Sequence, residues 1–145
     1  MMALSAIVAV ALFAIAALHA YWGFGGVWPG TDAASCARTV AGFRGVDTMP
    51  GPGASFAVTA ALAAAALIVL VQGGWILPPL PGALFTLAAI GAALVFLGRG
   101  IAGFTPAWRR LTPEQPFARL DVRYYSPLCL LIGLALLLLA LKGFV

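Results

Sequence analysis

Four long apolar stretches, nearly free of charge, constrain this chain more than any other feature. They cover about residues 2–22, 54–71, 81–101 and 127–144. A helix of about 20 residues crosses the ~30 Å hydrocarbon core of a bilayer, so each stretch has the length of one transmembrane span. The only charged residues within them, Arg99 and Lys142, lie near a span end, where a long side chain reaches the headgroups. The pattern predicts an all-α membrane protein with four transmembrane helices.

The composition excludes a water-soluble fold. Hydrophobic residues make up 63% of the 145 positions and charged residues only 8%, whereas soluble domains carry about 25% charged residues. A small soluble domain keeps much of its surface in water and cannot bury so much apolar area. The first stretch has no basic residues before it and is longer than the apolar core of a signal peptide, so we expect it to be a span.

The connections between the spans differ in length and polarity. Residues 72–80 form a short uncharged turn, which predicts an antiparallel pair of the second and third spans. Residues 24–53 and 102–126 are longer and hold nearly all the polar side chains. We therefore expect one membrane domain, residues 1–145, built as a four-helix antiparallel bundle with both long loops on one face.

The charges of this chain are divided unequally between the two membrane faces. The loop face receives all seven arginines: Arg38, Arg44, Arg99, Arg109, Arg110, Arg119 and Arg123. The opposite face has only Lys142, so the positive-inside rule predicts cytoplasmic loops and outside termini in a bacterial inner membrane. The net charge of +4 is then a topology signal and predicts no nucleic-acid partner. All four acids share the loop face, which leaves open that this face is charged because it binds something.

Capping signals predict where helices begin within and after the long loops. Thr31 is a candidate N-cap for a short helix in the first loop. In the second loop, Thr112 with Pro113 predicts an interfacial helix. Ser126 with Pro127 predicts the start of the fourth span at that position.

Stripes of small residues predict which helix faces pack together, because small side chains let helix backbones approach in lipid. The stripe on the first span is Ser5, Ala9, Leu12, Ala16, His19 and Gly23. The stripe on the fourth span is Ser126, Cys129, Gly133, Leu136, Ala140 and Gly143. The third span offers two equal faces, one with Gly82, Thr86, Ala89, Ala93, Phe96 and Gly100, and one with Ala88, Gly91, Val95 and Gly98. His19 and Cys129 are thus expected to face inward near the loop side.

Polar side chains at the loop-side ends of the spans form a candidate binding site. His19 is the only histidine, and an ionisable residue within a span is a functional hypothesis, although it can also simply bond a carbonyl. Arg99, Asp121 and Arg123 predict either a structural ion-pair cluster or a pocket for a lipid phosphate or carboxylate. The candidate binding residues are His19, Tyr21, Trp22, Arg99, Asp121, Arg123, Tyr124 and Cys129. An aromatic belt is the alternative for Tyr21, Trp22, Trp28 and Trp108.

No catalytic or metal-binding motif is present in the sequence, and we predict no cofactor. Cys129 at the start of the fourth span suggests an alternative, a membrane-bound enzyme or a thiol or quinone redox subunit. Such chemistry requires a pair of cysteines, and Cys36 is the only other cysteine in the sequence. A small oligomeric transporter is a third hypothesis. It requires a polar path through the membrane, for which the spans contain only small hydroxyl groups. We therefore expect a non-enzymatic binding or accessory protein, whose partners are membrane lipids, a small amphiphile, a partner helix or a second copy.

Two segments carry a resemblance to a known family. Residues 19–29 read HAYWGFGGVWP and residues 117–130 read FARLDVRYYSPLCL. Together with Val40–Gly42 and Met49–Pro50, they resemble the small bacterial membrane proteins of domain-of-unknown-function family 3995. The resemblance implies a multi-spanning membrane protein without an established activity or ligand. It therefore supports the architecture and leaves the function open.

Overall fold

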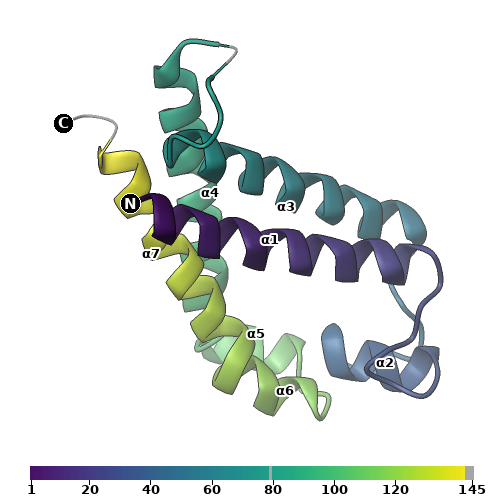
Figure 1. Cartoon of the computed structure of the whole chain (residues 1–145). Coiled ribbons are helices and arrows are strands. Elements are labelled where there is room, and N and C mark those ends of the chain that lie inside the picture. The colour runs from purple at the N-terminus through teal and green to yellow at the C-terminus, as the bar shows by residue number, and fades with distance from the viewer. Residues whose placement is uncertain (79, 143–145) are drawn as a thin grey trace.

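The computed structural model describes residues 1–78 and 80–142, and all regular structure in these ranges is helical (Figure 1). The long helices are α1 (Met2–Gly23), α3 (Pro52–Gln72), α4 (Gly82–Ala102) and α7 (Ser126–Lys142). The short helices are α2 (Ala33–Val40), α5 (Pro106–Leu111) and α6 (Phe117–Leu120), and the π-helix η1 (Asp121–Tyr125) joins α6 to α7. Four segments are long and apolar enough to cross a membrane, namely α1, α3, α4 and the continuous segment Phe117–Lys142. The four-span prediction is confirmed.

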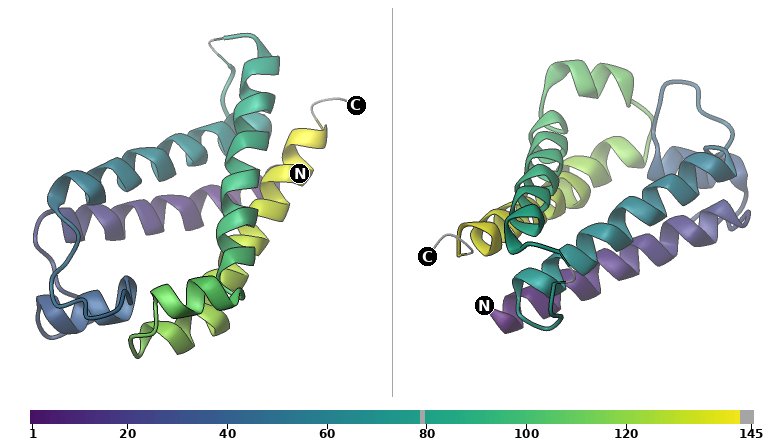
Figure 2. Two further views of the ribbon diagram at one scale, coloured as in Figure 1. Left: turned by 180° about the vertical axis from the view of Figure 1, so that it is seen from behind. Right: turned by 90° about the horizontal axis from the view of Figure 1, so that it is seen from above.

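The four long helices are arranged as two antiparallel hairpins, α1 with α3 and α4 with α7. The hairpins meet near the N-terminus and the α3–α4 turn, and they diverge toward the end that holds α2, α5 and α6 (Figures 1 and 2). The short turn after α3 therefore joins the two hairpins and does not create the tightest pair. We call the end where they meet the closed end, and the end with α2, α5 and α6 the loop end.

Small residues determine which faces are buried. The predicted stripe on α1 is correct, with Ser5, Ala9, Leu12, Ala16 and Gly23 buried. On α4 the structure selects the face with Thr86, Ala89, Ala93 and Gly100, which is buried, whereas Ala88, Gly91, Val95 and Gly98 are exposed. On α7 the buried members of the predicted stripe are Ser126, Gly133, Leu136 and Ala140, and Gly143 lies outside the described residues. Close backbone approach within each hairpin explains this choice.

The closed end is held by small side chains and neutral hydrogen bonds. A Cβ atom added at Gly73 would overlap the buried side chain of Ser5, so α3 and α1 approach as closely as a glycine allows. The Trp75 indole N–H donates to the backbone oxygen of Met2 at 3.2 Å. Gln72 at the end of α3 lies 3.3 Å from the Thr86 hydroxyl of α4.

The two long loops bind each other directly at the loop end. The Arg44 amide donates to the Leu111 oxygen at 3.1 Å, and the Glu114 amide donates to the Gly42 oxygen at 3.2 Å. The Glu114 carboxylate accepts from the Gly45 amide at 2.9 Å. Gly42 has a positive φ of 65° and lies directly under the Phe117 ring, where a Cβ would clash. These contacts link the α1–α3 hairpin to the α4–α7 hairpin across the gap between them.

Two predicted helix starts in the loops are wrong. The N-cap of α2 is Asp32, whose carboxylate accepts from the Ser35 amide at 2.7 Å, and not Thr31. Thr112 is fully buried at the end of α5, where its hydroxyl donates to the Trp108 oxygen at 2.9 Å. It therefore ends one helix, and the next helix begins only at Phe117.

Candidate functional site

The fourth span begins in the loop and not at Ser126. Ser126 has helical backbone angles (φ −67°, ψ −45°), and the chain passes through η1 from α6 into α7 without a break. A π-helix forms i to i+5 hydrogen bonds, so residues five apart lie above one another. This places the Ser126 hydroxyl 3.0 Å from Asp121, to which it donates. The predicted cap is wrong because the side chain of Ser126 bonds a carboxylate and the helix needs no cap there.

Asp121 is the centre of a buried polar network. Its side chain is fully buried and forms ion pairs with Arg99, at 2.7 Å, and with Arg109. The indole N–H of Trp108 donates to the second carboxylate oxygen at 2.9 Å. The guanidinium of Arg99 also stacks over the Trp108 ring, 4.6 Å from its centroid. A buried carboxylate is tolerated only when it is paired and hydrogen-bonded in this way, so the network fixes α4, α5 and η1 relative to one another.

The network carries one excess positive charge, because two arginines face a single carboxylate. Arg109 is used within the chain: its NH1 donates to the Ala118 oxygen at 2.7 Å and its NH2 to Thr112 and Asp121. Its buried Nε has no partner among the described residues. Arg99 makes one bond with NH1, to Ser126 at 3.2 Å, and one with NH2, to Asp121. Since a guanidinium has five N–H groups, three N–H groups of Arg99 have no partner within residues 1–78 and 80–142.

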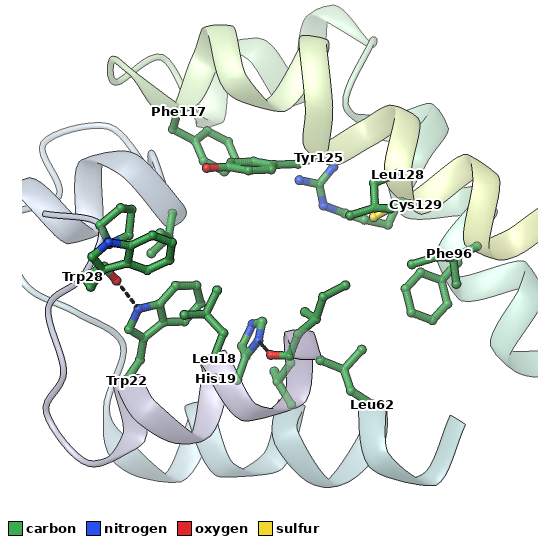
Figure 3. A pocket seen from close by; sticks show the side chains of 16 residues that line it. Leu18, His19, Trp22, Trp28, Leu62, Phe96, Phe117, Tyr125, Leu128 and Cys129 are labelled. Carbon is green, nitrogen blue, oxygen red and sulfur yellow. Dashed lines mark hydrogen bonds between the residues drawn. The ribbon is translucent and has the colours of Figure 1, made fainter. Parts of the chain in front are cut away.

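A cavity of about 650 Å³ lies between the two hairpins at the loop end (Figure 3). Aliphatic and aromatic side chains make most of its wall, among them Leu18, Leu62, Phe96, Phe117 and Ile132. Val58 on α3 and Leu128 on α7 also line it, and each is 40% exposed. The cavity is therefore open to the surroundings of the protein.

His19, Tyr125, Arg99 and Cys129 bring polar atoms to this wall. The His19 Nδ1 lies 2.9 Å from the Ile15 oxygen, and because a carbonyl only accepts, Nδ1 carries the hydrogen. The Nε2 of the neutral ring is then an acceptor, and it has no partner among the described residues. The Tyr125 hydroxyl donates to the Thr39 oxygen at 3.3 Å. Figure 3 shows His19 on one wall and Tyr125 with Cys129 on the wall opposite.

Four of the predicted site residues come together at the cavity, and a fifth supports it from behind. His19, Trp22, Arg99 and Cys129 line the wall. Asp121 does not line it and instead holds Arg99 in place. The predicted ion-pair cluster is present, with Asp121 paired to Arg99, whereas the predicted pocket for a lipid phosphate or carboxylate stays a prediction.

The other three predicted residues do not line the cavity. The Tyr21 hydroxyl accepts from the Trp28 amide at 3.3 Å and so shapes the turn after α1. Arg123 lies over the ring of Tyr124 at 5.5 Å, and both side chains are exposed. As binding residues they stay predictions without a contact to the cavity.

The sequence interpretation missed Arg109 and the role of Trp108. Both belong to α5, which begins at Pro106 after Thr105, whose hydroxyl accepts from the Trp108 amide at 3.3 Å. The Thr-Pro pair was an available start signal for this helix. The aromatic-belt prediction for Trp108 omits its hydrogen bond to Asp121, which no local pattern reveals because the partner lies 13 residues away.

Both cysteines are free thiols in the described structure. Cys36 is fully buried in α2, and its Sγ lies 3.6 Å from the Trp28 oxygen, to which it donates. Burial raises the pKa of the Cys36 thiol above its usual value. Neither cysteine belongs to a cluster of metal-ligating side chains within residues 1–78 and 80–142.

The fold and the site define the class of this protein: a multi-pass α-helical membrane protein with a cavity between two hairpins. The chain belongs to the family described as "Protein of unknown function (DUF3995)", whose model matches residues 12–136. The match extends over every residue that lines the cavity, and it confirms the resemblance seen in the two sequence segments. Comparison with curated proteins and with solved structures finds no match.

Proposed function

We propose that this protein binds a small amphiphile within the membrane and acts as a binding or accessory protein and not as an enzyme. The observation that carries the proposal is the cavity of about 650 Å³ at the loop end. Ligand pockets typically have volumes of about 300–1,000 Å³, with mostly apolar walls and a few convergent polar groups. This cavity has that size and that composition.

An occupied cavity is physically favoured over an empty one. Protein interiors are close-packed, and side chains beside a void lose dispersion contacts. Val58 and Leu128 at the opening face the acyl-chain region in a membrane, so an apolar molecule enters from the lipid without crossing water. In the bound state, the apolar part of the ligand lies among the aliphatic side chains and its polar part lies near His19 and Arg99.

A small molecule fits this space better than a partner helix. A helix with its side chains is about 10 Å across, so one that spans the membrane needs a groove along the full length of the hairpins. The hairpins meet at the closed end, where Gln72 of α3 lies 3.3 Å from Thr86 of α4. At the loop end, the hydrogen bonds between residues 42–45 and 111–114 bridge them. The space between these two contacts suits a ligand of limited length.

The orientation that we propose has both long loops in the cytoplasm and both termini outside the inner membrane. The support is the distribution of the seven arginines, all at the loop end, against Lys142. Reporter fusions at residues 46–48 and after residue 142 test it. We expect cytoplasmic activity for the first and external activity for the second. The reverse pattern contradicts the orientation.

The binding proposal is tested by filling the cavity. The protein is extracted with its native lipids in polymer nanodiscs, and bound molecules are identified by native mass spectrometry. We expect the wild type to retain one small amphiphile. Val58→Trp, which fills the opening, is expected to retain at least tenfold less, since an ordered ligand and a bulky side chain cannot share the space.

The matched control is Val95→Trp, at a side chain that is 71% exposed on α4 and does not line the cavity. This variant is expected to retain the ligand as the wild type does. The proposal fails if the wild type carries no retained molecule, or if Val58→Trp and Val95→Trp retain equal amounts.

A further inference from the structure

We infer that the ligand of this cavity is a single-chain amphiphile with one carboxylate head group, such as a long-chain fatty acid. The inference rests on the proposed binding function and adds the chemistry of the head group. It is carried by three observations: the free N–H groups of Arg99, the single excess charge of the network and the position of His19.

Arg99 is the only cation on the cavity wall among the described residues, and it is prepared for an acceptor. Asp121, Ser126 and the Trp108 ring fix its guanidinium, and three of its five N–H groups have no acceptor in the part of the chain that the structure describes. A planar guanidinium with neighbouring free donors matches a planar carboxylate, which accepts two parallel hydrogen bonds. An anchored arginine of this kind is preorganised, so little side-chain entropy is lost when the ligand binds.

The charge balance favours a head group with a single negative charge. Arg99 and Arg109 together exceed Asp121 by one positive charge, and the donors of Arg109 are directed at Asp121, Thr112 and Ala118. No residue named on the cavity wall is acidic, so a bound anion meets no like charge there. A phosphate monoester carries about 1.5 to 2 negative charges and three acceptor oxygens, more than one arginine neutralises.

His19 lies on the opposite wall and complements an acid in either protonation state. Its Nδ1 hydrogen is donated to the Ile15 oxygen, so Nε2 is the ring nitrogen that remains for a ligand. A neutral Nε2 accepts the proton of a carboxylic acid, and a protonated Nε2 donates to a carboxylate. Arg99 and His19 therefore bring two polar groups that suit an acid to opposite walls of the same cavity.

The test compares three probes that differ only in the head group. Purified protein in phosphatidylcholine nanodiscs is titrated with hexadecanoic acid, 1-hexadecanol or hexadecyl phosphate, and the bound fraction is measured by native mass spectrometry. We expect the acid to bind at least tenfold more tightly than the alcohol, which lacks the charge-assisted hydrogen bond to Arg99. We also expect it to bind at least tenfold more tightly than the phosphate, whose second negative charge has no partner in the cavity. Equal binding of all three, or tightest binding of the phosphate, overturns the inference and leaves the binding function intact.

Two variants connect the preference to the named side chains. His19→Phe keeps an aromatic ring beside Trp22 but removes Nε2, and Arg99→Lys keeps the charge but loses the planar fork. Each is expected to reduce the preference for the acid over the alcohol by about tenfold, whereas binding of the alcohol changes little. Because alcohol binding reports an intact cavity, a misfolded variant is recognised by its loss.

The control for both variants is Arg110→Lys, which makes the same exchange at an exposed arginine outside the cavity. It is expected to leave the preference for the acid unchanged. An unchanged preference in both His19→Phe and Arg99→Lys overturns the inference. If no probe binds the wild type, or if every probe binds Val58→Trp as tightly as the wild type, the proposed binding function itself fails.

Discussion

The closed end and the loop end of this protein are held together by different forces. At the closed end, small side chains such as Ser5 and Gly73 bring the backbones into contact, and the hydrogen bonds are neutral. At the loop end, the contacts are made by a buried carboxylate, two arginines and pairs of backbone groups from the loops. The candidate site occurs only at the second end, where the hairpins do not touch.

The two ends differ in what joins the hairpins. Lipid is as apolar as leucine, so helices associate in it through close packing and polar bonds. At the loop end, the hairpins present Leu18 and Trp22 to Phe96 and Leu128 across the cavity (Figure 3). The cavity separates the long helices there, so the loop–loop hydrogen bonds link the two hairpins, and the ion pairs fix α5 and η1 to α4 within one hairpin.

Removal of the buried carboxylate is expected to have the largest effect and to act on the loop end alone. Asp121→Ala leaves Arg99 and Arg109 without their partner, which costs about 3 kcal/mol of stability, the lower end of the range for a broken buried pair because both arginines are partly exposed. Unfolding in mixed micelles of mild detergent and dodecyl sulfate measures the loss.

The control for this prediction is Asp121→Asn, which removes the charge but keeps one acceptor oxygen, enough for either the Ser126 hydroxyl at Oδ1 or the Trp108 indole at Oδ2. It is expected to lose less stability than Asp121→Ala. If both variants are as stable as the wild type, the polar network does not hold the loop end.

A methyl group at the closed end is expected to have the next largest effect. Gly73→Ala forces the backbones of α1 and α3 apart at Ser5 and is expected to cost about 1–3 kcal/mol, as overpacking of a dense site does. The same micelle unfolding assay measures it. Gly91→Ala is the matched control, since nothing lies within 4 Å of its added Cβ. Equal stability of the two variants contradicts the close contact at Gly73.

The labelling rate of the Cys36 thiol is expected to show a smaller effect, and it reports on the packing of α2 at the loop end. In a Cys129→Ala background, we expect a small maleimide to label Cys36 at pH 7.5 at least tenfold more slowly in the folded protein than in dodecyl sulfate. Burial restricts access and raises the pKa of the thiol, so little thiolate is present. If Cys36 in the folded protein is labelled at the unfolded rate, it is not buried at the loop end.

The helix cap of α2 gives the smallest effect and one that depends on pH. The amide of Ser35 beside Asp32 lowers the pKa of the carboxyl below its usual value. The cap therefore stabilises α2 fully above the usual pKa, and the stabilisation is lost as the pH falls through the lowered value. Amide protection of residues 33–40 by NMR is expected to fall at acid pH in the wild type. In Asp32→Asn, the amide protection of residues 33–40 is expected to change little with pH. An equal fall in the wild type and in the variant would show that protonation of Asp32 is not the cause.

The spans were predictable from sequence because length and hydropathy alone decide them. The buried face of α1 was also predictable, since Ser5, Ala9 and Ala16 form one small-residue stripe. The choice of face on α4 was not, because Ala89 and Gly91 are equally small and only the position of α7 separates them. The cavity depends on the divergence of the hairpins, which residues far apart in the chain set together. The predicted helix start at Ser126 was wrong because a serine followed by a proline usually marks the start of a helix. The hydrogen bond of Ser126 to Asp121 depends on the π-helix, which the sequence does not reveal.

The π-helix has one more consequence, for how this chain tolerates insertions and deletions. A π-turn is an α-helix with one additional residue. The loss of one residue here can therefore be absorbed by a return to the ordinary α-helix, and the residues that follow keep nearly the same rotational phase. A deletion between Ser126 and Gly133 has no such release and would rotate the rest of α7 by about 100°, the angle between successive residues. Gly133, Leu136 and Ala140, which are buried, would then turn away from their present packing. This short segment thus tolerates a change in length that the rest of the last span does not.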